Sequence, residues 1–337
     1  MNPDYLHRPG ESPMSDVDNI VGQITRDDID RARSLLRDVA IRTPLVPVSA
    51  ANGRAALAKA ENIQPYGSFK IRCGSYAVLS VPDECLDRGL YTASAGNFGQ
   101  GVAAAAARRG VPTRVYAPDN AARTKIGMMR SLGAEVIEVS FSRWWEILSG
   151  EIPEGETAHM VHPCRGREVL IGNATIGAEI IEDAPDIDAI LVPFGGGGLV
   201  LGIAAAIRLL APHIELIACE ASSSTPFTSA LAAGKPVAVE SDPDSFIDGI
   251  GGAMVLPSAW PLLREYVAGT AVVDDEQAAA VVAMMFRKHR LIVEGAGAVP
   301  IACALTKPDF ANRKVAAIMS GGNIDEQVLT DILRRHS

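Results

Sequence analysis

The chain has 337 residues, of which 48% are hydrophobic, and it carries a formal net charge of −9. This length is enough for two domains, at roughly 150 residues each. The negative charge argues against nucleic acid as the main partner, because phosphate binding needs a basic surface. No apolar run approaches the roughly 20 residues of a membrane span, and the start of the chain lacks a secretory pattern.

Five cysteines stand at positions 73, 85, 164, 219 and 303, with no CxxC pair among them. An odd number without such spacing is typical of free thiols in a reducing cytoplasm rather than of a disulfide framework. The six histidines form no zinc-binding pattern, so we expect no zinc site. We therefore predict a cytoplasmic protein that contacts neither membrane nor nucleic acid.

Extended and helical segments alternate along most of the chain. The first residues are polar and rich in proline, and we expect residues 1–24 to be a disordered tail. Thr25 and Asp28 then form a capping pattern before an amphipathic helix. The expected strands are 90–95, 113–117, 134–139, 158–162, 188–194, 214–220 and 314–319. The expected helices are one that includes Lys70, 97–109, 121–132, a short one around Trp144, 168–182, 199–210, one from Thr225, 274–290, 295–305 and 324–335.

This alternation predicts a doubly wound α/β protein, with parallel strands and helices on both faces. Strands such as 188–194 are apolar almost throughout, as central parallel strands are when both of their faces are covered. Between 234 and 257, the density of Gly, Pro, Asp and Ser predicts a long loop. Loops of that length in compact domains usually have a function.

One lysine stands out in the stretch 64-QPYGSFKIRCG-74. Pro65 and Gly67 favour a turn, and Ser68 is placed to cap a helix that would hold Lys70 in its first turn. A cation there opposes the helix dipole, which indicates a use other than stability. A lysine kept neutral by its surroundings forms Schiff bases with carbonyl compounds. The alternative is an ordinary solvated surface lysine.

Four consecutive glycines, Gly195, Gly196, Gly197 and Gly198, lie between an apolar strand and a helix. Their bare N–H groups and the following helix N-terminus suit a phosphate group. The spacing matches neither GxGxxG with an acidic ribose partner nor GxxxxGK[ST], so a monophosphate is favoured over a dinucleotide or a nucleoside triphosphate. The alternative is a tight strand-to-helix crossing that needs glycine for clearance.

Two further motifs follow predicted strands. The stretch 94-SAGNFGQG-101 opens a helix and offers N–H groups to a carboxylate, or else Ser94 or Asn97 only caps that helix. In 319-MSGGNID-325, Ser320 ends the last strand, and its hydroxyl either faces a ligand or belongs to a capped turn. Because parallel strands share one carboxyl edge, we expect all four motifs to converge on one site.

A lysine for a Schiff base, a cradle for one phosphate, a carboxylate loop and a hydroxyl for a ring nitrogen together describe a pyridoxal 5′-phosphate site. From about Ile24 to its end, the chain resembles the fold-type II pyridoxal phosphate enzymes of the serine/threonine dehydratase (threonine ammonia-lyase) group. The resemblance rests on GSFKIR, SAGN, GGGGL and SGGN, with supporting matches at 43-TPL-45, Lys125, 162-HP-163 and 294-EGAGA-298.

The resemblance implies two doubly wound parallel-sheet domains of the tryptophan synthase β-like kind. Residues 25–88 with 166–337 would form the large cofactor-binding domain, and residues 89–165 a small mobile one. Lys70 would carry the cofactor and act as the catalytic base. The other implied cofactor-binding residues are Asn97 at the phenolic oxygen, Gly195, Gly196, Gly197, Gly198 and Leu199 at the phosphate, Glu294 near the ring and Ser320 at the pyridine nitrogen. The implied substrate-binding residues are Ser94, Ala95, Gly96, Asn97 and Phe98.

The chain also departs from the family pattern. Phe98 stands where the family usually has His, Cys73 where it has Gly, Tyr66 where it has a smaller residue, and 172-GNAT-175 where it has GQGT. Serine racemases of this fold carry a second serine at the position of Ala95, so Ala95 favours elimination over racemisation. Some relatives bind a cation with residues matching Glu220 and Pro226, and the proline puts a metal site in doubt. We expect Arg143 or Arg165 to help to bind the substrate carboxylate.

The predicted function is β-elimination from a small β-hydroxy amino acid such as L-threonine or L-serine, which gives a 2-keto acid and ammonia. We expect the enzyme to be a homo-oligomer. A β-replacing enzyme, a racemase and a non-catalytic binding protein are the alternatives. Four glycines in place of a threonine-bearing phosphate loop argue against β-replacement, and Lys70 argues against a protein without catalysis.

Overall fold

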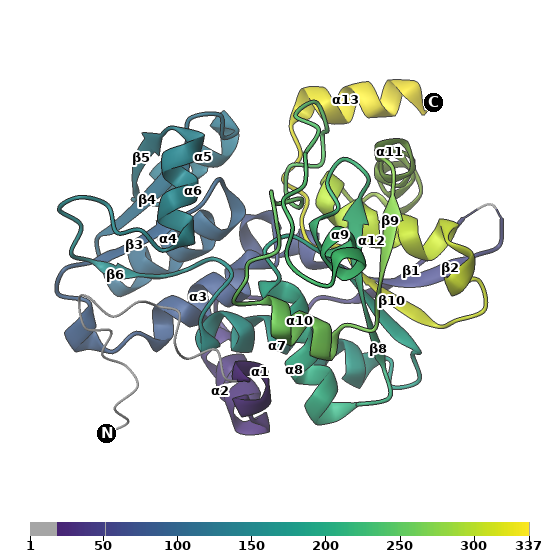
Figure 1. Ribbon diagram of the computed structural model, residues 1–337, viewed down its shortest axis with the longest axis horizontal. Coiled ribbons are helices and arrows are strands. Elements are labelled where there is room, and N and C mark those ends of the chain that lie inside the picture. Colours follow the sequence, from purple (N-terminus) through teal and green to yellow (C-terminus); the bar gives the residue numbers. More distant parts are fainter. Residues whose placement is uncertain (1–18, 51, 337) are drawn as a thin grey trace.

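Two separate β-sheets organise the protein, and Figure 1 shows them side by side. The computed structural model describes residues 19–50 and 52–336. The six-stranded sheet has the order β1-β2-β10-β7-β8-β9 and the four-stranded sheet has the order β5-β4-β3-β6. The strands of the first are β1 Leu45–Ser49, β2 Ala55–Lys59, β10 Val315–Ile318, β7 Ala189–Pro193, β8 Glu215–Ala221 and β9 Gly269–Val273. Those of the second are β5 Glu135–Val139, β4 Thr113–Pro118, β3 Leu90–Ala93 and β6 His159–Met160.

Helices cover both faces of each sheet. They are α1 Ile20–Gln23, α2 Arg26–Leu36, α3 Lys70–Ser80, α4 Asn97–Arg109, α5 Arg123–Ser131, α6 Phe141–Ser149, α7 Arg167–Asp183, α8 Gly198–Leu210, α9 Pro226–Ala233, α10 Trp260–Tyr266, α11 Asp275–Met284, α12 Gly295–Thr306 and α13 Glu326–Arg335. Short 3₁₀ turns occur at Glu61–Ile63, Pro65–Gly67, Asp83–Cys85 and Pro308–Phe310, and a π-helix at Met285–His289. Among the described residues, no helix combines the length and the apolarity needed to cross a membrane.

The alternation of side chains along the strands sorts the core into layers. Ala316 and Ile318 of β10 pack with α2, α3, α7 and α8, whereas Val315 and Ala317 pack with α11 and α12 on the other face. Successive residues of a strand point to opposite faces, so a strand that is apolar at every position feeds both cores. In the small sheet, α6 covers one face and α4 with α5 covers the other. The expected α/β architecture is therefore confirmed.

One pair of strands breaks the expected parallel pattern. β1 pairs antiparallel with β2, while β2–β10, β10–β7, β7–β8 and β8–β9 are all parallel. All pairs of the small sheet are parallel. The sequence gives little sign of this hairpin, because Pro47 interrupts the first strand and the second, AALAK, is rich in alanine. Helix α10 and strand β9 were also not expected.

Two local expectations are wrong. The tail does not extend to residue 24, since α1 forms at Ile20–Gln23 and the side chains of Val21 and Ile24 are buried. Residues 1–18 lie outside the described part of the chain. Ser68 does not cap α3, whose N-cap residue is Phe69 without a side-chain hydrogen bond. The four-stranded sheet lies within residues 89–165, and the mobility of that unit stays a prediction.

Candidate active site

The lysine segment and the last strand are joined through their backbones. The N–H of Phe69 donates to the carbonyl of Ser320 at 2.9 Å, and the N–H of Gly322 donates to the carbonyl of Gly67 at 2.9 Å. Ser68 and Gly321 form an isolated bridge between these two bonds. The start of α3 is thereby fixed at the carboxyl end of β10, where open α/β sheets bind ligands. Two of the four motifs therefore meet.

Lys70 is the first residue of α3 and is half-buried. Its Nζ lies 4.9 Å from the ring centre of Phe69 and 5.5 Å from that of Phe98. The Lys70 amine makes no hydrogen bond or ion pair with any residue that the structure describes. The Lys70 amine is therefore not committed to a carboxylate and can be offered to a ligand.

The four glycines span the junction between β7 and α8. Gly197 has a φ of +85°, a conformation that favours glycine, and Gly198 begins α8. A Cβ on Gly196 would collide with the sulfur of Cys164, and one on Gly198 would lie 3.0 Å from the Cys164 carbonyl. On the far side, the Asn173 amide donates to the carbonyl of Gly198 at 3.1 Å. Cys164 and Asn173 therefore contact the glycine loop, which leads into the N-terminus of the 13-residue helix α8.

The SAGN loop reaches across from the small sheet to α12. Asn97 begins α4, and its Nδ2 donates to both carboxyl oxygens of Glu294, at 3.1 and 3.3 Å. Glu294 is the N-cap residue of α12, and its N–H donates to the carbonyl of Gly321 at 2.9 Å. Two residues from separate parts of the prediction, Asn97 and Glu294, are therefore in direct contact beside the serine motif.

Lys125 and Asp248 form an ion pair next to this contact. The Nζ of Lys125 on α5 lies 2.7 Å from Oδ2 of Asp248, which belongs to the long loop 234–257. The side chain of Lys125 also packs on Gly96, where an added Cβ would come within 2.5 Å of it. Burial lowers the pKa of Lys125, but the carboxylates of Asp248 and Glu294 outweigh burial and raise it. Sequence reasoning missed Asp248, and the composition of its loop was the only signal.

Ser320 is buried, with 2% of its surface exposed, and its hydroxyl makes no hydrogen bond to any described residue. The Ser320 oxygen is not among the fully enclosed, unpaired side-chain atoms of the described residues, so it is open enough for a ligand to reach it. The glycine loop at the start of α8, the Lys70 amine and the Ser320 hydroxyl are groups of the kinds that a phosphate, an aldehyde and a ring nitrogen need, so the residues fit pyridoxal phosphate.

The predicted substrate residues have different environments. The Ser94 hydroxyl accepts hydrogen bonds from the N–H groups of Gly96 at 3.2 Å and Gly99 at 2.9 Å, so it holds the loop in shape. The N-cap residue of α4 is Gly96, without a side-chain hydrogen bond, so neither Ser94 nor Asn97 is its N-cap residue. Ala95 is exposed on the loop. Phe98 is buried with 2% exposure and packs in the core beside Lys70.

The arginine expectation fails for Arg143. Its guanidinium pairs with Glu146 and Glu151 on and just beyond its own helix, so it does not serve a substrate carboxylate. Arg165 is half-buried, its guanidinium donates to the carbonyl of Ser149 at 3.5 Å, and burial lowers its pKa. Neighbouring His162 fixes this segment, because its Nδ1 accepts from the N–H groups of Cys164 and Arg165 at 3.0 Å.

Glu220 is committed to the start of α9. Its carboxylate accepts from the N–H groups of Phe227 at 2.7 Å and Thr228 at 2.9 Å, next to Pro226, the first residue of the helix. Burial raises the pKa of Glu220, and these bonds lower it in part. In the described residues, no group of three or more acidic, His or Cys side chains is placed to hold a metal.

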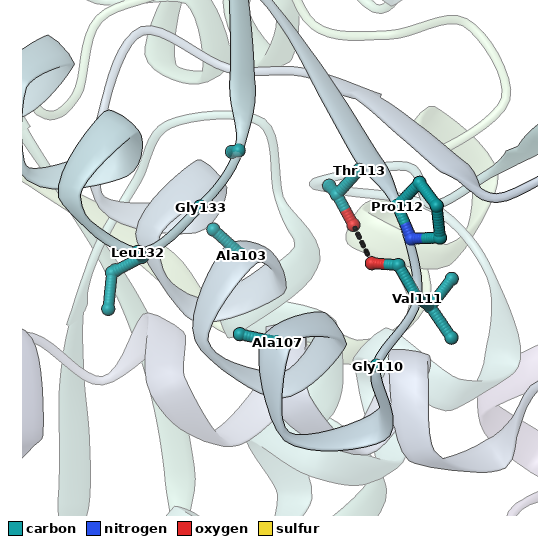
Figure 2. Close-up of a pocket in the computed structure, with 9 residues that line it drawn as sticks. Ala103, Ala107, Gly110, Val111, Pro112, Thr113, Leu132 and Gly133 are labelled. Atoms are coloured by element: carbon teal, nitrogen blue, oxygen red, sulfur yellow. Dashed lines mark hydrogen bonds between the residues drawn. The ribbon is translucent and has the colours of Figure 1, made fainter.

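A surface hollow lies at the amino ends of β4 and β5, whereas the SAGN motif follows the carboxyl end of β3; Figure 2 shows the residues that line the hollow. Its lining residues are Ala103, Ala107, Gly110, Val111, Pro112, Thr113, Leu132, Gly133 and Ala134. None of these side chains is charged or nucleophilic apart from the Thr113 hydroxyl, which donates to the carbonyl of Val111 at 3.3 Å. The hollow therefore offers no chemistry to compete with the Lys70 site.

Glu294 leads to a prediction for stability. Burial raises its pKa from an ordinary 4.5 to about 7, and Asp248 adds to the rise while Lys125 and Asn97 oppose it. Between these pH values the folded state holds a proton that the unfolded chain releases, so the free energy of unfolding should fall as the pH rises. The fall should reach up to about 3 kcal/mol, at roughly 1.36 kcal/mol for each pH unit.

Urea unfolding of the cofactor-free protein at about pH 5 and about pH 8 measures this change. The variant Glu294→Gln, with an amide that does not titrate, should lose less stability over the same range by that amount. An equal loss in both proteins would mean that Glu294 is ionised throughout.

Comparison with known proteins identifies a family that matches most of the chain. The family model described as "Pyridoxal-phosphate dependent enzyme" matches residues 36–321. An L-threonine ammonia-lyase of Thermotoga maritima is 36% identical over 317 residues, which are 93% of this chain and 79% of the relative. A serine racemase of Oryza sativa subsp. indica is 31% identical, over 90% of this chain and 92% of the relative.

A solved structure of maize serine racemase is also similar. It has a TM-score of 0.80 and 30% sequence identity, and the match covers 92% of this chain and 97% of that one. The expected fold type, the cofactor pyridoxal phosphate and the class, a lyase that depends on it, are confirmed by these matches together. The chain belongs to the family of pyridoxal-phosphate dependent enzymes.

Proposed function

We propose that this enzyme removes the hydroxyl group from a small β-hydroxy amino acid and gives a 2-keto acid and ammonia. The observation that supports elimination is the state of the SAGN loop. Racemisation needs a second proton-carrying group opposite Lys70, but position 95 is alanine and the Ser94 hydroxyl already accepts two N–H groups of its own loop. With a single base, a proton leaves the substrate but is not returned from the other side.

We assign the residues as follows. Lys70 carries the cofactor and takes the α-proton of the substrate with its amine. The N–H groups of residues 195–199 hold the phosphate, Ser320 meets the ring nitrogen, and Asn97 and Glu294 lie at the ring edge. Bound there, pyridoxal phosphate supplies the electron sink that lets a proton and a β-substituent leave an amino acid.

The neutral hydroxyl of Ser320 supports the same direction. A carboxylate opposite the ring nitrogen would stabilise a positive charge on it, whereas a hydroxyl does not. The sink is then weaker, and prompt loss of the β-group is favoured over a carbanion that lives long enough to be reprotonated. Similar relatives include both an ammonia-lyase and a racemase, so racemase activity is the second candidate.

Phe98 bears on the choice of substrate. Its ring lies 5.5 Å from the Lys70 amine, where the family usually offers an imidazole, so the site presents an apolar face rather than a hydrogen-bonding one. We propose that a β-hydroxy amino acid other than threonine is the better substrate. A methylene group more or less in such a pocket changes specificity constants by about 10- to 200-fold.

Product analysis tests both proposals. Purified enzyme with pyridoxal phosphate is given L-serine, L-threonine, hydroxyaspartate and phenylserine, and keto acid, ammonia and the opposite enantiomer are measured. We expect keto acid and ammonia to form faster than the enantiomer, with threonine not the leading substrate. Faster racemisation of serine would contradict elimination. If threonine leads and Phe98→His changes nothing, the altered pocket is wrong.

We further propose a cytoplasmic homo-oligomer that acts on a small amino acid. All five cysteines are free thiols, which supports a reducing compartment. Size-exclusion chromatography with light scattering would test the oligomeric state.

A further inference from the structure

Asn323, the last residue of the SGGN motif, links three segments of the site with one amide group. Its Nδ2 donates to the backbone carbonyl of Tyr66 at 2.8 Å and to Oδ1 of Asn97 at 2.9 Å. Its Oδ1 lies against Gly67, where an added Cβ would collide with it. The amide is therefore held through its Nδ2, and its Oδ1 occupies space that a side chain at position 67 would need.

The backbone carbonyl sets the direction of this chain of amides. A carbonyl oxygen only accepts hydrogen bonds, so the atom of Asn323 that faces Tyr66 is the donor Nδ2. The second hydrogen of that NH₂ group goes to Asn97, which must turn its oxygen toward Asn323. The NH₂ group of Asn97 then points the opposite way, to the carboxyl group of Glu294.

Tyr66 adds a second observation. It has a φ of +62°, in the left-handed region that residues with a Cβ rarely adopt. Asn323 donates to the carbonyl of this strained residue, four positions before Lys70. One amide therefore stabilises the turn that leads to Lys70 and orients a side chain of the SAGN loop.

We propose that Asn323 is a positioning residue that fixes the Asn97 amide with its N–H groups toward the cofactor side. The inference rests on the proposed site. Both carboxyl oxygens of Glu294 lie within 3.3 Å of the Asn97 Nδ2. An NH₂ group has two hydrogens, so we infer that one serves Glu294 and the other donates to an anionic oxygen such as the phenolic oxygen of pyridoxal phosphate. Without Asn323, Glu294 alone orients the Asn97 amide, and a turned amide would present its oxygen, which repels that ligand.

A double-mutant cycle on cofactor affinity tests the proposal. Asn323→Asp keeps the shape but only accepts, and Asn97→Ala removes the group through which Asn323 acts. Each single change should weaken the binding of pyridoxal phosphate by about tenfold, the value of one hydrogen bond to a charged group. The double variant should lose about tenfold as well, because both changes remove the same interaction. An additive loss of about 100-fold would overturn the proposal.

Asn62 provides the matched control. Its Nδ2 donates to the carbonyl of Ile292 at 2.8 Å, and its side chain packs beside Gly322, but it does not contact Asn97. In the Asn62→Leu background, adding Asn97→Ala should weaken cofactor binding by the same factor as in the wild-type protein. In the Asn323→Leu background, adding Asn97→Ala should weaken it little further. Equal behaviour of the two leucine variants would show that Asn323 has only a structural role.

The readouts keep separate failures apart. The absorbance maximum of the bound cofactor should shift in Asn323→Asp and Asn323→Leu but not in Asn62→Leu, and thermal unfolding shows which variants fold. If Asn323→Asp does not fold, Asn323→Leu decides the cycle. If the wild-type protein does not bind pyridoxal phosphate at Lys70, the proposed site is wrong. If it binds there and the losses are additive, only the role of Asn323 is wrong.

Discussion

Replacing Lys70 with alanine should lower turnover of every substrate by at least about a thousandfold, because the base and the group that carries the cofactor are lost together. The Lys70 amine has no hydrogen-bond or ion-pair partner among the described residues, so its removal should reduce the stability of the fold little. Keto-acid formation and the absorbance of bound cofactor measure the effect, and thermal unfolding shows that the variant is folded.

Lys70→Arg is the matched control. Arginine keeps the positive charge and the contacts to the rings of Phe69 and Phe98, but its guanidinium group does not release a proton in proteins. It should be as inactive as the alanine variant. Substantial activity in Lys70→Arg would mean that the lysine acts only through its charge.

Replacing Arg72 with leucine should reduce the free energy of unfolding by roughly 3–5 kcal/mol, because a buried ion pair would lose one partner. Arg72 follows Lys70 by two residues and contacts Glu61 at 2.9 Å and Glu179 at 2.7 Å. Lys59 completes the cluster, with its Nζ 2.6 Å from Glu179. All four side chains are buried, so the positive and negative charges are balanced without water.

The pKa shifts agree with this arrangement. Burial raises the pKa of Glu179, but Arg72 and Lys59 outweigh burial and keep it below its ordinary value. Without Arg72, two carboxylates would share the buried site with Lys59 alone. Urea unfolding measures the loss of stability. We expect the midpoint of the Arg72→Leu transition to be lower and the slope to be unchanged.

Arg130→Leu is the control for this prediction. Arg130 also pairs with a glutamate, Glu138 at 2.9 Å, but its side chain is 52% exposed. An exposed pair contributes about 0–1 kcal/mol, so the control should change stability little. Similar losses in the two variants would show that burial of Arg72 is not what makes it important.

Much of the fold follows from local patterns. The apolar run 188–194 became β7, and the glycines after it lead into α8, whose first N–H groups have no partner within the helix. The capping pattern of Thr25 and Asp28 formed as expected. Such signals lie within a few residues of each other, so the sequence shows them directly.

Contacts between distant residues were beyond the sequence. Asn97 and Asn323 are 226 positions apart, and Lys125 and Asp248 are 123 apart. No local pattern specifies which polar side chains meet across a folded chain. The expectation for Arg143 went wrong for the opposite reason. Its partners Glu146 and Glu151 are close to it in sequence, and it pairs with them locally.

The attachment point of the cofactor tests the central claim most directly. The protein is incubated with pyridoxal phosphate, reduced with borohydride so that the cofactor stays on its lysine, digested and examined by mass spectrometry. The proposed site predicts the added mass on the peptide that contains Lys70. The added mass on Lys125, the lysine that pairs with Asp248 beside the same site, would contradict it.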